Sequence, residues 1–169
     1  SGGKDTSMLA HRLKYEYGMH PLCYTFAPPI YTEIGWKNLR KFIDTGLDHF
    51  LYTPGGPLYR SFCKIGLIVL GDHLEIWDRA VLSIPPRLAL QNNVKLIMYG
   101  ENGELEYGGS EKYKHMSKEG PEEWEYEYYK GASVDDLINK GLEKKIFSKE
   151  EIKEKTFELY KPPHPEIII

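Results

Sequence analysis

Short apolar runs alternate with helical patterns in this chain, and this alternation constrains the fold more than any other feature. The apolar runs cover residues 22–26, 48–53 and 94–99. Nearly continuous apolar strands that are separated by amphipathic helices are typical of a parallel sheet covered by helices on both faces. The sequence therefore predicts an α/β protein with a parallel sheet.

Two amphipathic helices are predicted, one before the first apolar run and one between the first and second runs. The first follows a glycine-rich turn at residues 1–7, and its inward face would contain Met8, Leu9, Leu13 and Tyr17. The second covers residues 33–45, with Trp36, Leu39, Phe42 and Ile43 inward. Gly18 and Gly46 are suited to the left-handed conformation that ends a helix, so we expect the helices to stop there.

The middle of the chain contains two breaks in the pattern. Residues 58–71 leave a strand and the buried end of a helix equally open. A helix over residues 72–82 is followed by Pro85 and Pro86, which we expect to break it and to start another helix ending at Asn92. Asp72 fits the cap of the first of these helices better than a sugar contact.

Two capping boxes predict a C-terminal helical hairpin. Ser133 pairs with Asp136, and Ser148 pairs with Glu151, in the spacing that closes a helix N-terminus. We therefore expect a first domain over residues 1–115, which lacks the buried strand that normally precedes such a glycine-rich turn. An acidic, tyrosine-rich segment and the hairpin follow over residues 116–169, and we expect the protein to continue beyond them.

Composition excludes several classes of protein. The 169 residues include 22 Lys and Arg and 25 Asp and Glu, so the net charge is −3 and no basic field is available for nucleic acid. The longest aliphatic run, residues 65–70, is far shorter than the roughly 20 residues of a membrane span. Cys23 and Cys63 stand far apart, which fits a reducing cytoplasm and excludes a disulfide framework. The six histidines show no ligand spacing for a metal site.

The glycine-rich turn Ser1-Gly2-Gly3-Lys4-Asp5-Thr6-Ser7 carries the clearest chemical signal. Small residues at a helix start direct several backbone N–H groups to one point, where the helix dipole also favours an anion, so the turn is suited to phosphate. The hydroxyls of Ser1, Thr6 and Ser7 add donors, and Lys4 adds a cation. A Walker A loop is excluded because Asp5 follows Lys4, and such an acid is useful for holding Mg²⁺ or fixing the loop. A capped turn that binds nothing is the alternative.

The same seven residues resemble the S-G-G-x-D-S signature of the PP-loop ATP pyrophosphatases, with Thr6 in place of the usual serine. Two further stretches, P-P-I-Y-T-E-I-G at residues 28–35 and G-E-N-G-E-L-E-Y-G-G at residues 100–109, narrow the resemblance. Together they resemble the N-acetyl sugar amidotransferases of lipopolysaccharide O-antigen and flagellin glycan synthesis. The resemblance covers most of residues 1–109 and implies a Rossmann-like fold of the adenine nucleotide alpha-hydrolase type.

The resemblance also implies roles for particular residues. Asp5 and Glu101 would be catalytic, and Asp5 would hold a Mg²⁺ ion that arrives with ATP. The pyrophosphate part of ATP would bind Ser1, Gly2, Gly3, Lys4, Thr6 and Ser7. The nucleotide or substrate pocket would contain Tyr31, Glu33, Gly100, Asn102 and Glu106. All three motifs follow predicted strands, and ligands bind beyond the carboxyl ends of the strands in such sheets. Structural alternatives are a turn cap for Glu101 and an ordinary first-turn acid for Glu33.

The implied reaction adenylates the acetamido oxygen of an N-acetyl sugar and lets ammonia displace AMP to form an acetamidino group. The expected substrates are ATP with Mg²⁺ and a nucleotide-linked sugar. The ammonia would come from a separate glutaminase, because Cys23 lies in a predicted buried strand and Cys63 lacks the small neighbours of a nucleophile elbow. A tRNA-modifying enzyme that thiolates or forms lysidine, and an inactive nucleotide-binding scaffold, are the rival interpretations. The sequence leaves a homo-oligomer open.

Overall fold

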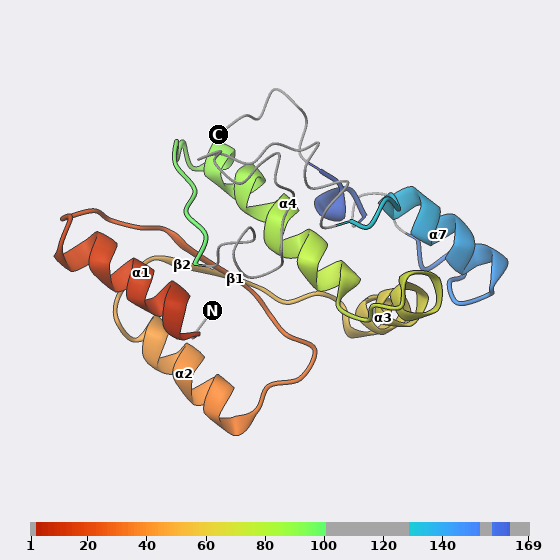
Figure 1. Ribbon diagram of the computed structural model, residues 1–169, viewed down its shortest axis with the longest axis horizontal. Helices are drawn as coiled ribbons and strands as arrows, with labels where there is room; N and C mark the ends of the chain where they lie inside the picture. The colour runs from red at the N-terminus through yellow and green to blue at the C-terminus, as the bar shows by residue number, and fades with distance from the viewer. Residues whose placement is uncertain (1–2, 101–128, 153–156, 163–169) are drawn as a thin grey trace. The chain divides into compact units, whose positions relative to one another are not determined.

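The computed structural model describes residues 3–100, 129–152 and 157–162 of the chain, and Figure 1 shows the elements in these ranges. The chain divides into two compact units. Unit 1 comprises residues 1–53 and 98–115, and unit 2 comprises residues 54–97 and 116–169. Helices and a pair of parallel strands make this an α/β protein, which confirms the predicted class.

Unit 1 contains two parallel strands joined by a helix. The strand β1 (Cys23–Phe26) pairs with β2 (His49–Tyr52), and α2 (Glu33–Ile43) connects them. The helix begins after Thr32, whose Oγ1 accepts a hydrogen bond from the Gly35 N–H at 3.0 Å. A threonine in this position satisfies one of the backbone donors that every helix start leaves free. Both strands and the helix confirm the sequence prediction within two residues.

The two strands present chemically different faces. Aligned residues of parallel strands share a face, so the register places Tyr24, Phe26, Phe50 and Tyr52 together on one side. The rings of Phe26 and Tyr52 stack with centroids 5.5 Å apart. On the other side His49 Nε2 lies 2.8 Å from Thr25 Oγ1, and Phe42 of α2 packs edge-on against the His49 ring. The helix α2 therefore covers the face that carries His49.

The helix α1 (Lys4–Tyr15) also lies in unit 1, and its predicted inward face is only partly correct. Its one buried residue is Ala10, whereas the Met8 side chain is 60% exposed and Tyr17 lies beyond the end of the helix. On α2, likewise, Leu39 and Phe42 are buried but Trp36 and Ile43 are exposed. An amphipathic face is buried only where another element covers it, and two four-residue strands offer a narrow surface.

Unit 2 is helical in its described part. Its elements are α3 (Gly56–Leu70), α4 (Glu75–Gln91), α7 (Val134–Glu143) and the 3₁₀ turn η2 (Glu158–Tyr160). Residues 58–71, which the sequence left open, are thus helical. Pro57 lies in the first turn of α3, and Gly71 ends the helix in the left-handed conformation with φ of 73°.

An aromatic cluster forms the core of unit 2. The ring of Phe62 on α3 lies 5.2 Å from the rings of Phe147 and Phe157 and 6.2 Å from that of Tyr160, measured between centroids. All four side chains are buried. These contacts join α3 to the residues that follow α7 and to η2, so the C-terminal segment is part of the core of this unit.

The capping boxes form as predicted. Ser133 Oγ accepts from the Asp136 N–H and the Asp136 carboxylate accepts from the Ser133 N–H, both at 3.0 Å. The same reciprocal bonds join Ser148 and Glu151. The first box begins α7. The helix expected after the second box falls partly on residues 153–156, which lie outside the described residues.

The predicted break at Pro85 and Pro86 is wrong, because α4 continues through both prolines. The prolines remove two backbone donors from the helix. However, Ile84, Pro86 and Ala89 are all buried, so the buried face of α4 extends across the prolines. Tertiary packing of this face outweighs the local preference for a break.

The predicted strand at residues 94–99 is also wrong. These residues belong to no strand, and Val94, Leu96 and Met98 are exposed by 37%, 54% and 49%. A strand needs a neighbour with which to form its hydrogen-bond ladder, and the sheet described here contains only β1 and β2. Within the described ranges, no helix has the length and hydropathy needed to cross a membrane.

Candidate functional site

The start of α1 is the part of the predicted phosphate loop that the structure describes. Gly3 precedes the helix in an extended conformation and supplies no side-chain cap. The Ser7 N–H donates to the Gly3 carbonyl at 3.1 Å, so the first intrahelical bond begins there. The N–H groups of Lys4, Asp5 and Thr6 come before Ser7 in the chain, so they have no acceptor within the helix. They form the positive end of the helix dipole. This arrangement suits an anion. Ser1 and Gly2 lie outside the described residues.

The carboxylate of Asp5 is accessible to a cation. It lies 3.3 Å from Lys4 Nζ, and the two side chains are 56% and 91% exposed. Such an exposed pair is screened by water and holds neither partner firmly. No group of three His, Cys, Asp or Glu side chains that could hold a metal exists in the described part of the chain. One carboxylate together with phosphate oxygens is, however, an ordinary way to hold Mg²⁺.

Gly100 lies against the first turn of α1. A methyl group built on Gly100 would be 2.5 Å from Thr6 Oγ1 and 2.7 Å from Thr6 Cα, which is closer than a real methyl group can approach. Only glycine permits this separation between the two backbones. The structure therefore brings together Thr6 of the first motif and Gly100 of the third, although the sequence separates them widely.

Tyr99, the residue before Gly100, acts electrostatically on Tyr24 of β1. Burial raises the pKa of Tyr24 in β1, and the neighbouring hydroxyls of Tyr52 and Tyr99 raise it further. Residues 99 and 100 both belong to unit 1.

The second motif supplies an aromatic pair at the start of α2. The rings of Tyr31 and Trp36 meet edge-on with centroids 5.0 Å apart. The Tyr31 hydroxyl is buried without a hydrogen-bond partner among the described residues, and burial raises its pKa. A buried hydroxyl without a partner is costly unless a ligand or water completes its bonding. Tyr31 is thus a candidate contact for a polar ligand group, and Trp36, which the sequence pattern assigned to the core, is a second candidate for this pocket.

Glu33 has a simpler environment. Its carboxylate lies 3.0 Å from Lys37 Nζ in the ordinary i, i+4 arrangement, and its side chain is 84% exposed. An acid in the first turn of a helix is favoured by the helix dipole. Glu33 therefore fits the structural alternative better than the pocket.

Three of the predicted site residues, Glu101, Asn102 and Glu106, lie outside the described residues. Gly100 is the first residue of the third motif and is followed by Glu101 and Asn102. Its position beside Thr6 therefore shows that this motif begins next to the first turn of α1. Among the described residues, no hydrogen bond or ion pair joins Tyr31 or Glu33 to Thr6 or Gly100.

No protein-family model matches this chain, and no curated protein is significantly similar to it. The function must therefore be argued from the motifs and from the geometry of the site.

Proposed function

We propose that this chain is an ATP-dependent amidotransferase, a C–N ligase that releases AMP and pyrophosphate. Its substrate is a nucleotide-linked N-acetyl sugar, whose acetamido group becomes an acetamidino group for O-antigen or other surface glycan synthesis. The observation that carries the proposal is the close approach of Gly100 to Thr6, because it joins the phosphate-binding motif to the start of the G-E-N-G-E motif. We propose further that β1 and β2 belong to a Rossmann-like sheet.

The residues at the start of α1 fit the pyrophosphate part of ATP. The free N–H groups of the first turn, the hydroxyls of Thr6 and Ser7 and the cation of Lys4 supply donors to phosphate oxygens. Asp5 would hold Mg²⁺ together with those oxygens, and the ion would supply positive charge beside the phosphates. The exposed carboxylate of Asp5 supports this assignment.

The reaction has two steps. The acetamido oxygen attacks the α-phosphorus of ATP, and the bond from that phosphorus to pyrophosphate breaks. Ammonia then attacks the carbon that carries the new adenylate, AMP leaves with the former acetamido oxygen, and Glu101 accepts a proton from the nitrogen. Adenylation is needed because an amide oxygen is a poor leaving group. Donors at the start of α1 stabilise the charge on the departing pyrophosphate.

The ammonia comes from a separate glutaminase. Glutamine hydrolysis needs an activated thiolate, whereas burial raises the pKa of Cys23 in β1 and of Cys63 in α3. Neither thiol has the environment of a nucleophile. The purified protein should therefore use ammonium, and it should use glutamine only after a glutaminase is added.

The direct experiment incubates the whole protein with ATP, Mg²⁺, ammonium and a nucleotide-linked N-acetyl sugar. We expect AMP and pyrophosphate in equal amounts, formed only when sugar and ammonium are both present. Formation of these products with unmodified tRNA in place of the sugar would favour a tRNA-modifying enzyme. Binding of ATP without turnover on either substrate would favour an inactive nucleotide-binding scaffold.

A further inference from the structure

A turn in unit 2 has an unusual backbone. Lys130 and Gly131 both have positive φ, 51° and 67°, and the Ala132 N–H donates to the Tyr129 carbonyl at 3.0 Å. Two central residues with positive φ define a type I′ turn, in which glycine or asparagine is preferred. Lys130 is neither. An L-residue with a long side chain is strained in this conformation.

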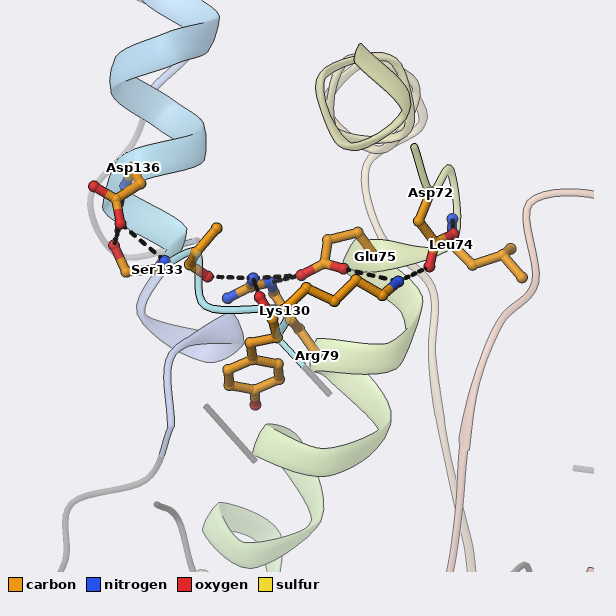
Figure 2. Close-up of polar contacts among 9 residues, drawn as sticks. Asp72, Leu74, Glu75, Arg79, Lys130, Ser133 and Asp136 are labelled. Carbon is orange, nitrogen blue, oxygen red and sulfur yellow. Dashed lines mark hydrogen bonds and ion pairs between the residues drawn. The ribbon is translucent and has the colours of Figure 1, made fainter. Parts of the chain in front are cut away.

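The carbonyl groups of the turn bind Arg79 on α4. Arg79 Nη2 donates to the Tyr129 carbonyl at 3.3 Å and to the Ala132 carbonyl at 2.5 Å. The guanidinium also lies over the Tyr129 ring, 4.3 Å from its centroid. Arg79 is fully buried and is paired with the buried carboxylate of Glu75 one helical turn earlier. Figure 2 shows Arg79 beside Glu75 on α4, with Lys130 of the turn next to them.

The side chain of Lys130 binds the other end of the same network. Its Nζ pairs with Asp72, and it lies 3.7 Å from Glu75 Oε2. Asp72 in turn accepts a hydrogen bond from the Leu74 N–H at 2.8 Å. Asp78 on α4 also acts to raise the pKa of Lys130, and His73 acts to lower the pKa of Asp72. We call Asp72, Glu75, Arg79 and Lys130 the charge clasp.

The hydrogen-bonding capacity of the charge clasp is only partly used when the clasp is closed. Glu75 Oε2 and Arg79 Nη1 are buried and have no hydrogen-bond partner among the described residues, and Lys130 is strained. Buried polar atoms without such partners weaken the closed state. The ion pair with Lys130 is the contact that compensates Glu75 Oε2. Closure therefore depends on the charge of Lys130.

We propose that the charge clasp is a conformational device that holds the turn at residues 129–132 on α4 and opens when Lys130 loses its ion pairs. Ser133, which caps α7, follows the turn directly, and α7 packs on α3. Opening of the clasp releases the start of α7 and lowers the protection of α7 in a local unfolding event. None of the four residues belongs to the proposed nucleotide site.

Lys145 provides a matched control for the backbone strain. It also has a positive φ, 55°, and lies just after α7, but its side chain has no ion pair or hydrogen bond within the described ranges. Glycine relieves the strain at either position. If strain alone matters, both Lys130→Gly and Lys145→Gly should increase the protection of α7.

The test measures amide hydrogen exchange of α7 in the whole protein, with α1 as the reference. We expect Lys130→Gly to lower the protection of α7 by about tenfold, the equivalent of about 1.4 kcal/mol. Lys145→Gly should equal or exceed the wild type, and Lys130→Arg, which keeps the charge, should stay within about threefold of it. If the protection of α7 in Lys130→Gly equals or exceeds that of the wild type, the proposed role of the charge clasp is wrong.

A second measurement decides the matter if Lys130→Gly does not fold. Lys130 is partly exposed, so added salt screens its ion pairs. The protection of α7 in the wild type should fall as sodium chloride rises from about 0.05 M to about 1 M, while that of α1 changes little. Protection of α7 that is independent of salt would contradict the proposal.

Discussion

Gly100 is a residue whose lack of a side chain has a specific geometric reason. An alanine there would place its methyl group within 2.7 Å of the Thr6 Cα, so the backbone around residue 100 would have to move away from α1. We expect Gly100→Ala to raise the Kd for ATP by about tenfold or more, measured by calorimetry. Gly55→Ala is the control, because φ at Gly55 is −61° and a methyl group there meets no atom within 4 Å. An unchanged Kd in Gly100→Ala would show that the close approach of Gly100 to Thr6 is not needed for ATP binding.

Asp5 allows a second test at the scale of one residue. Replacement by Asn keeps the shape of the side chain but removes the charge that would hold Mg²⁺, so turnover should fall by about a hundredfold or more. The melting temperature should hardly change, because Asp5 is exposed and its pair with Lys4 is screened. Glu16→Gln near the end of the same helix, which breaks the exposed pair with Arg12, is the matched control and should keep its activity. Wild-type rates in Asp5→Asn would refute the role of Asp5.

Arg79 links two parts of unit 2 at the scale of the secondary-structure elements. Arg79→Met leaves the buried carboxylate of Glu75 without its main partner and removes the donor to two turn carbonyls. We expect a loss of about 3–5 kcal/mol in the free energy of unfolding, measured with urea. Arg12→Met breaks a pair of the same i, i+4 spacing on the surface of α1 and should change this free energy little. Equal effects of the two substitutions would contradict the importance of the buried pair.

Asp72 makes the start of α4 sensitive to acid. Burial acts to raise the pKa of Asp72, but the hydrogen bonds from Lys130 and the Leu74 N–H and the charge of Lys130 outweigh it, and the net pKa is lowered. A lowered pKa in the folded state stabilises the fold above the unfolded-state pKa of about 3.9, and this contribution is lost as the pH falls through the folded pKa. Between about pH 6 and pH 2, Asp72→Asn should therefore show a smaller loss of unfolding free energy than the wild type. Parallel curves for the two proteins would show that Asp72 does not contribute.

The success of the sequence predictions depended on the range of the interactions. The cap at Ser133 and the start of α2 at Thr32 were predictable because their partners lie three residues away. The strand expected at residues 94–99 and the break expected at Pro85 were wrong because pairing and burial, which the local sequence does not contain, decided them. The contact of Gly100 with Thr6 follows the motif resemblance, whereas nothing in the local sequence connects Lys130 with Asp72.

At the scale of the whole molecule, the proposed nucleotide site and the charge clasp belong to different units. Unit 1 contains the start of α1, the aromatic pair at Tyr31 and the segment at Gly100. The charge clasp and the aromatic core lie in unit 2. Substitutions at the start of α1 should therefore alter turnover with little effect on stability, whereas substitutions in the clasp should alter stability and the protection of α7.

The transfer of a heavy oxygen isotope from the sugar distinguishes adenylation of the acetamido group from its phosphorylation. The acetamido oxygen of the sugar is labelled, the whole protein is supplied with ATP, Mg²⁺ and ammonium, and the products are analysed by mass spectrometry. Because AMP leaves with the former acetamido oxygen, we predict that the label appears in AMP, one atom for each acetamidino group formed. Label in inorganic phosphate, with ADP as the other product, would mean that the γ-phosphate is transferred and would contradict the account.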